Sequence, residues 1–151
     1  MYKYKIIDSN TRFIVTSDVD AFYEATFNGD EETAKETVSS LNVKIIELEA
    51  LKKLKENSQQ AQKKIEEFYR DSPSFEQETF PIQQTEYYAY LLDENVPTPF
   101  VDGILLDSET KVELMTRIGL AISYIQGIQK EMRQHSKDIK ACDSLDCLGS
   151  L

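Results

Sequence analysis

The sequence is poor in the residues that build metal sites and disulfide frameworks. Its 151 residues include no tryptophan, two cysteines and one histidine. Structural zinc takes four Cys or His ligands, and this chain has three such residues in all, so only a site shared between chains could hold it. A disulfide scaffold needs more cysteines, spread along the chain. We therefore expect Cys142 and Cys147 to be ordinary free thiols in a C-terminal tail.

Positive charge and long apolar runs are also scarce. Lys and Arg number 17 against 27 Asp and Glu, which gives a net charge of −10. This balance argues against duplex nucleic acid or an anionic membrane surface as the main partner, because both are polyanions. No apolar run approaches the roughly 20 residues of a membrane-spanning helix. Residues 1–5 lack the apolar core of a secretory signal, so we expect a soluble protein made in the cytoplasm.

No constellation of catalytic residues stands out. His135, the one histidine, has no partner within reach in the sequence for acid–base work or metal binding. The five glycines are isolated, so none forms a phosphate-cradling loop. Gly119 and Gly127 fall inside a predicted helix, where they favour close approach of another helix or chain. We expect no enzyme activity, cofactor or metal.

The clearest pattern in the sequence is a long amphipathic helix from residue 108 to about residue 139, with Ser108 as its cap. Apolar residues recur at alternating spacings of three and four, the period of a heptad seam. A second row, at residues 114, 121 and 128, widens the stripe, which favours burial against two or more helices. Polar residues, Gln129 and Ser136, occupy two seam positions and suggest control of register or oligomer state. The seam is Met115, Ile118, Ile122, Ile125, Gln129, Met132 and Ile139.

The first 30 residues predict a β-hairpin and a short helix. Residues 2–7 alternate between apolar and polar, and residues 12–16 are rich in β-branched and aromatic side chains. Since a lone hairpin is marginally stable, this one must pack on something. The spacing of Val19, Phe22, Tyr23 and Phe27 favours a short helix before the break at residues 28–29.

A second long helix is predicted from about residue 30 to residue 69, capped by Asp30. Two alternatives stay open, a break near residues 39–40 and a strand over residues 41–45, which alternate. Three apolar residues spaced by three, at positions 48, 51 and 54, form a local phase slip in the seam. The seam residues that we single out are Leu41, Ile45, Leu48, Ile65 and Phe68.

Composition changes sharply between residues 71 and 107, which hold eight acidic residues and no Lys or Arg. Helical spacing returns over 84–92, and Thr98-Pro99 predicts a short helix from Pro99 to Leu106, since proline favours the first helical position. The fold class is thus mainly α, with an N-terminal β-hairpin and long helices joined by a Pro-rich acidic connector. We divide the chain into residues 1–70, 71–107 and 108–151.

Four short stretches carry a family resemblance. They read TFPIQQTE (79–86), YLLD (90–93), VPTPFVDGI (96–104) and KVEL (111–114). Over about residues 79–125 they resemble a module of bacteriophage and prophage tail proteins, with the pattern T-F-x-x-Q-x-x-E-A, a short helix, P-T-P and a further helix. Residues 85 and 87 depart from the Glu- and Ala-like residues of that pattern, and LLDS (105–108) replaces its usual arginine-bearing turn.

The resemblance implies a protein associated with the tail fibre or its assembly, with no catalytic residues. Physically, the motif can act as a packing device in which prolines fix the chain direction on either side of the 84–92 helix. Its aromatic and apolar side chains then dock on the long C-terminal helix. The packing residues are Phe80, Tyr87, Tyr90, Pro99, Phe100 and Ile104.

The expected function is a non-enzymatic, structural accessory protein of the virion tail, bound to the tail fibre or baseplate. The partners are other tail or fibre proteins and further copies of the chain, as a dimer or trimer through coiled-coil seams 34–68 and 115–139. Alternatively, the two long helices pair antiparallel within one chain. Alternative functions are a tail-fibre assembly chaperone in the host cell and an acidic inhibitor of a basic host protein.

Overall fold

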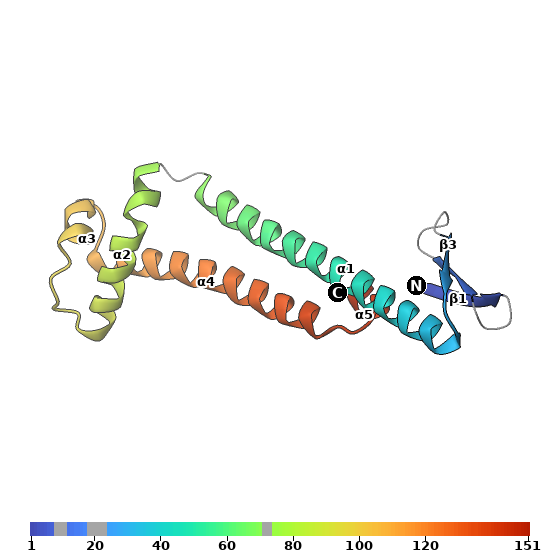
Figure 1. Cartoon of the computed structure of the whole chain (residues 1–151). Coiled ribbons are helices and arrows are strands. Elements are labelled where there is room, and N and C mark those ends of the chain that lie inside the picture. Colours follow the sequence, from blue (N-terminus) through green and yellow to red (C-terminus); the bar gives the residue numbers. More distant parts are fainter. Residues whose placement is uncertain (8–11, 18–23, 71–73) are drawn as a thin grey trace. The chain divides into compact units, whose positions relative to one another are not determined.

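A computed structural model of the chain confirms the predicted fold class (Figure 1). The structure describes residues 1–7, 12–17, 24–70 and 74–151, and only the backbone of residues 74–76. Among these residues, no helix is long and apolar enough to cross a membrane. The elements are β1 (Tyr2–Ile7), β2 (Arg12–Ser17), β3 (Glu24–Asn28), α1 (Glu31–Tyr69), α2 (Ser74–Leu92), α3 (Pro99–Ile104), α4 (Lys111–Ala141) and α5 (Leu145–Gly149).

The N-terminal hairpin belongs to a three-stranded antiparallel sheet of order β1-β2-β3. The third strand corrects the predicted short helix at Phe27; residues 18–23, where the rest of that helix was placed, lie outside the described residues. Phe27 pairs in register with Phe13, and their stacked rings lie 5.4 Å apart. Phe13 and Val15 are fully buried, together with Ala34 of α1. The sheet therefore finds the packing partner that a hairpin requires.

Helix α1 is continuous, so neither the break at 39–40 nor the strand over 41–45 occurs. Asp30 caps it as predicted, because its carboxylate accepts hydrogen bonds from the Thr33 backbone N–H and hydroxyl at 2.9 and 2.8 Å. Asn42 holds the helix to the sheet: its Oδ1 accepts from the Tyr2 backbone N–H at 2.7 Å. Because residues 34, 38 and 41 belong to the sheet's core, the first part of the α1 seam is occupied within the chain.

The last part of α1 packs antiparallel on α4. The Asn57 amide donates to the Met132 carbonyl and to the Ser136 hydroxyl, both at 2.9 Å. Further along, the rings of Phe68 and Tyr124 lie 5.1 Å apart. As residue numbers rise on α1, those of their partners on α4 fall. The structure thus has the antiparallel pairing within one chain that the sequence left as an alternative.

Helices α2 to α4 differ from expectation at their ends. Helix α2 starts ten residues before the predicted Gln84 and carries Pro81 inside it, so Pro81 does not mark a change of chain direction. Helix α3 starts at Pro99, as predicted, and ends at Ile104. The cap of α4 is Thr110 and not Ser108: its hydroxyl accepts from the Glu113 backbone N–H, and the Glu113 carboxylate accepts from the Thr110 N–H. This reciprocal pair is a capping box.

The C-terminal tail is structured, which corrects two expectations. Cys142 and Cys147 form a disulfide and are not free thiols. Five residues between Leu145 and Gly149 form α5, which Ser144 caps by accepting a hydrogen bond from the Cys147 backbone N–H. Leu148 of α5 is fully buried. The disulfide closes the turn between α4 and α5, so the short helix is held in place covalently.

The chain forms two compact units, residues 1–55 with 137–151 and residues 56–136. The first holds the sheet, the start of α1, and α5. The second holds the end of α1 with α2, α3 and most of α4. This partition differs from the division at residues 70 and 107 that we drew from composition. That division stays a prediction.

Candidate functional site

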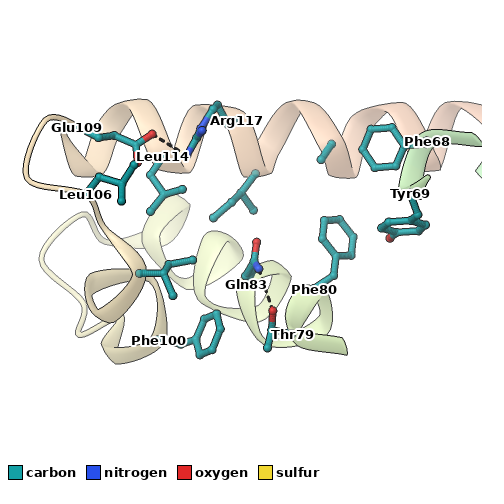
Figure 2. Close-up of a pocket in the computed structure, with 13 residues that line it drawn as sticks. Phe68, Tyr69, Thr79, Phe80, Gln83, Phe100, Leu106, Glu109, Leu114 and Arg117 are labelled. Carbon is teal, nitrogen blue, oxygen red and sulfur yellow. Dashed lines mark hydrogen bonds and ion pairs between the residues drawn. The ribbon is translucent and has the colours of Figure 1, made fainter. Parts of the chain in front are cut away.

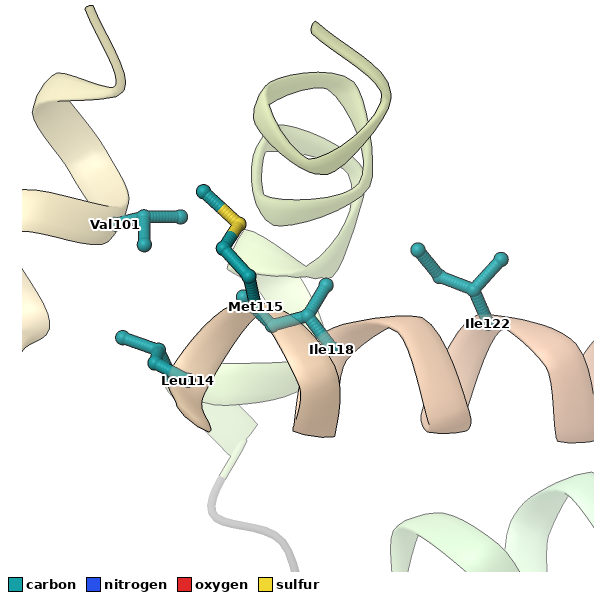
Figure 3. Packing of buried hydrophobic residues seen from close by; sticks show 5 residues of the cluster. All are labelled: Val101, Leu114, Met115, Ile118 and Ile122. Carbon is teal, nitrogen blue, oxygen red and sulfur yellow. The ribbon is translucent and has the colours of Figure 1, made fainter. Parts of the chain in front are cut away.

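The second unit is built around one face of α4. Leu114, Met115, Ile118 and Ile122 of α4 are buried with Val101 of α3 (Figure 3). Figure 3 shows Val101 directed at Met115 across the α3–α4 contact. Phe80, Tyr87 and Tyr90 of α2 and Leu105 pack against this cluster. Three predicted seam residues and three predicted motif residues thus meet in a single core.

A carboxylate fixes α3 in place. Glu86 of α2 accepts hydrogen bonds from the backbone N–H groups of Phe100 and Val101, at 3.0 and 2.8 Å. These are among the N–H groups that a helix start leaves without a partner in the helix, and a carboxylate there is also favoured by the helix dipole. Thr98, at the N-cap position, makes no side-chain capping bond. Glu86 therefore caps α3 from outside the helix, in place of the residue at the N-cap position.

Tyr87 and Gly119 fix the distance between α2 and α4. A Cβ atom added at Gly119 would lie 2.5 Å from the Tyr87 hydroxyl and 2.7 Å from Cζ, which is too close for a real side chain. The predicted close approach at Gly119 is confirmed, and its partner is a tyrosine of the same chain. At Gly127 the added atom would meet nothing within 4 Å, so within the chain no close approach occurs there.

A largely apolar pocket of about 470 Å³ opens beside this core (Figure 2). Its size falls within the range of roughly 300–1,000 Å³ that is typical of binding sites. The end of α1 contributes Phe68 and Tyr69, and α2 contributes Phe80 with a polar pair in which Gln83 donates to Thr79 at 3.1 Å. The remaining lining comes from α3, the loop after it and α4: Phe100, Ile104, Leu106, Glu109, Leu114, Arg117, Ile118 and Ala121.

One ion pair lies at the wall of the pocket. Arg117 Nη2 and Glu109 Oε1 are 2.7 Å apart, drawn as a dashed line in Figure 2. The Glu109 side chain is only 12% exposed, whereas Arg117 is 64% exposed. The second carboxylate oxygen of Glu109, Oε2, is buried and has no hydrogen-bond partner among the described residues. A buried acceptor that is left without a hydrogen bond is costly.

Lys111 braces α3 against the start of α4. Its Nζ lies 3.1 Å from Asp102 and 5.9 Å from the centre of the Tyr90 ring. The hydrogen bond and positive charge of Lys111 lower the pKa of the Asp102 carboxyl. At the other end of the unit, burial raises the pKa of the Tyr69 phenol above its usual value of 10.0. Neither shift creates an acid or base poised near neutral pH.

The predicted site residues separate into buried, half-buried and exposed groups. Met115, Ile118, Ile122 and Ile139 are buried. Two predicted seam residues are exposed in the single chain, Gln129 and Leu48, the latter to 67%. Pro99 and Ile104 are also exposed, although Ile104 still lines the pocket. The half-buried residues are Leu41, Ile45, Ile65, Phe68, Phe80, Tyr87, Tyr90, Phe100, Ile125 and Met132.

Sequence reasoning missed the polar groups of the site. Glu109 and Arg117 are eight residues apart, straddle the start of α4, and stand among many other charges, so no spacing rule singles them out. Asn57 was also missed, because a single Asn in a Lys- and Glu-rich helix carries no local signal of burial. Ser136 was singled out as a polar seam position, and it binds Asn57.

Within the described residues, no group of three or more His, Cys, Asp or Glu could hold a metal ion. His135 is half-buried on α4. No protein-family model matches the chain, and the comparisons with curated proteins and with solved structures also found no match.

Proposed function

We propose that this protein is a non-enzymatic accessory protein of a phage tail, which associates with the tail fibre or baseplate through helical packing. The observation that carries the proposal is how the stretches resembling the tail-protein module fit together. Phe80, Tyr87 and Tyr90 pack on the α4 core, and Phe100 and Ile104 line the pocket. Glu86 ties the first stretch to the P-T-P helix by two hydrogen bonds. A preformed apolar pocket with few polar groups favours a role in binding.

The setting is tested by locating the protein in infected or induced cells that carry its gene. Particles purified through a density gradient are analysed by quantitative mass spectrometry. We expect the protein in the particles at a fixed ratio to the tail-fibre or baseplate proteins. Its absence from particles, combined with a complex with fibre protein in the cell extract, would replace the proposal by the assembly-chaperone alternative. Absence from both would overturn it.

A further inference from the structure

From the pocket of Figure 2 we infer that the second unit captures a short segment of a partner protein, an apolar anchor side chain flanked by Lys or Arg. The inference deepens the proposed docking role and rests on it, but it does not depend on the phage setting. Two independent features of the site lead to it, the lining of the pocket and the charge around it.

The lining selects an apolar anchor. Ring or aliphatic side chains from four parts of the chain converge on the pocket, including Phe68, Phe80 and Leu114. At about 470 Å³ the space is large enough to take up a large apolar side chain. Buried apolar surface contributes roughly 25 cal/mol per Å², so one anchor residue can supply most of the affinity of a modest complex.

The charge selects a basic flank. Residues 77–107, which include most of α2, all of α3 and the segment between them, carry six acids and no Lys or Arg. At the pocket itself, Arg117 uses only one oxygen of Glu109. The other oxygen, Oε2, is buried and unpaired. A Lys or Arg next to the anchor would be attracted by the acids of α2 and α3 and by the Glu109 carboxylate, whereas an acidic segment would be repelled.

The probe is a displayed library of random twelve-residue peptides, selected against the full-length protein. We expect enriched peptides to share an aromatic or aliphatic residue beside Lys or Arg. A synthetic copy should bind with a Kd in the micromolar range by fluorescence anisotropy and shift the amide resonances of the pocket residues. Replacement of its basic residues by Gln should weaken binding by about tenfold, because the attraction to the acids of the site is lost.

Matched variants locate the binding. Ala121→Trp fills the pocket and should weaken the peptide at least tenfold. Ser123→Trp adds the same ring at an exposed site two residues away on α4, outside the lining, and should change Kd less than twofold. Glu109→Gln should reduce the preference for the basic peptide over its Gln version, while Asp107→Asn, which removes an exposed charge outside the pocket, should not. Circular dichroism and thermal unfolding verify that each variant is folded.

Three outcomes would overturn the inference. They are enrichment of acidic peptides, equal loss of binding in Ala121→Trp and Ser123→Trp, and peptide enrichment on the wild type that is no stronger than on Ala121→Trp. A dimer that Ala121→Trp dissociates would show that a second copy occupies the pocket, and would also refute it. Failure of the proposed tail role looks different, because the peptide result would stand while the protein would be missing from particles and from fibre complexes.

Discussion

At the residue scale, the contact that sets the register of α1 on α4 is the one made by Asn57. Its amide donates to the Met132 carbonyl and the Ser136 hydroxyl, and Asn57 is 9% exposed. We expect Asn57→Ala to destabilise the protein by about 1–2 kcal/mol. In a double-mutant cycle with Ser136→Ala, the coupling energy between Asn57 and Ser136 should be about 0.5–1 kcal/mol. Urea unfolding measures the free energy of unfolding of the wild type, the two single variants and the double variant.

The cycle has a clear contrary result. If the Asn57→Ala and Ser136→Ala effects add within about 0.3 kcal/mol, the side chains do not interact in solution. The Met132 carbonyl alone would then account for the effect of Asn57→Ala.

Two glycines of α4 form a matched pair for the contact with α2. Alanine in a helix interior normally stabilises by about 1 kcal/mol relative to glycine. Gly127→Ala should show this gain, since nothing lies within 4 Å of the added methyl group. Gly119→Ala should instead destabilise by about 1–3 kcal/mol, because its methyl group would overlap the Tyr87 ring. Chemical unfolding of both variants decides; equal gains would mean that Tyr87 does not rest on Gly119.

At the element scale, the helices were largely predictable and the third strand was not. The seam of α1 and the stripe of α4 repeat over many turns, so local spacing alone predicts them. In Glu24–Asn28 the signal is five residues long, and Phe27 also fits a helical spacing with Tyr23. What decides its structure is pairing with β2 across the Phe13–Phe27 contact, which local spacing does not contain.

The pocket was even less predictable, for the same reason. Phe80, Phe100 and Ile104 were expected to pack on α4, as apolar motif residues. That packing leaves a space beside Glu109, which depends on how four segments meet. Residue patterns identify faces that must be buried, but not the gaps left between them.

The capping box at the start of α4 makes a pH-dependent contribution to stability. Hydrogen bonds from the Thr110 backbone and hydroxyl lower the pKa of Glu113 below its usual 4.5. Because the pKa is lowered in the folded state, the stabilisation is present above the unfolded pKa and is lost as pH falls through the folded one. Glu113→Gln should therefore have a lower Tm than wild type at pH 7, and the difference should shrink as pH falls below 4.5 through the lowered folded pKa. A Tm difference that is constant from pH 7 to 3 would contradict this.

The disulfide makes α5 dependent on redox state. Closing so short a loop is worth about 2 kcal/mol in the chain-entropy estimate. Reduction, or the double substitution Cys142→Ser and Cys147→Ser, should lower the free energy of unfolding by about that amount and speed amide hydrogen exchange at residues 145–149. Amides of residues 56–136, the second unit, that exchange through local opening should not change. Labelling of two thiols without reductant would show that the bond does not form in solution.

At the scale of the whole molecule, the question is which apolar seam is left for self-association. Met115, Ile118 and Ile122 lie in the α4 core, and residues 34, 38 and 41 of α1 pack on the sheet. Ile122→Asp would therefore unfold the second unit. Loss of an oligomer in this variant would not show that the seam itself forms the interface. The exposed remainder on α1 is centred on Leu48 and Leu51, 67% and 63% exposed.

Any dimer that forms through the exposed leucines of α1 has to be weak. A stable interface buries about 1,600 Å² in total, far more than two leucines per chain provide. We expect light scattering to find a monomer at low micromolar concentration and a dimer at several hundred micromolar. The double substitution Leu48→Glu and Leu51→Glu should abolish the dimer without changing Tm, because both side chains already lie in water in the single chain. The control for added negative charge is Gln59→Glu with Gln60→Glu, which adds the same two charges at exposed, neutral residues of the same helix. A monomer at every concentration would refute self-association through α1, and the exposed Leu48 and Leu51 would then be available to a different partner protein.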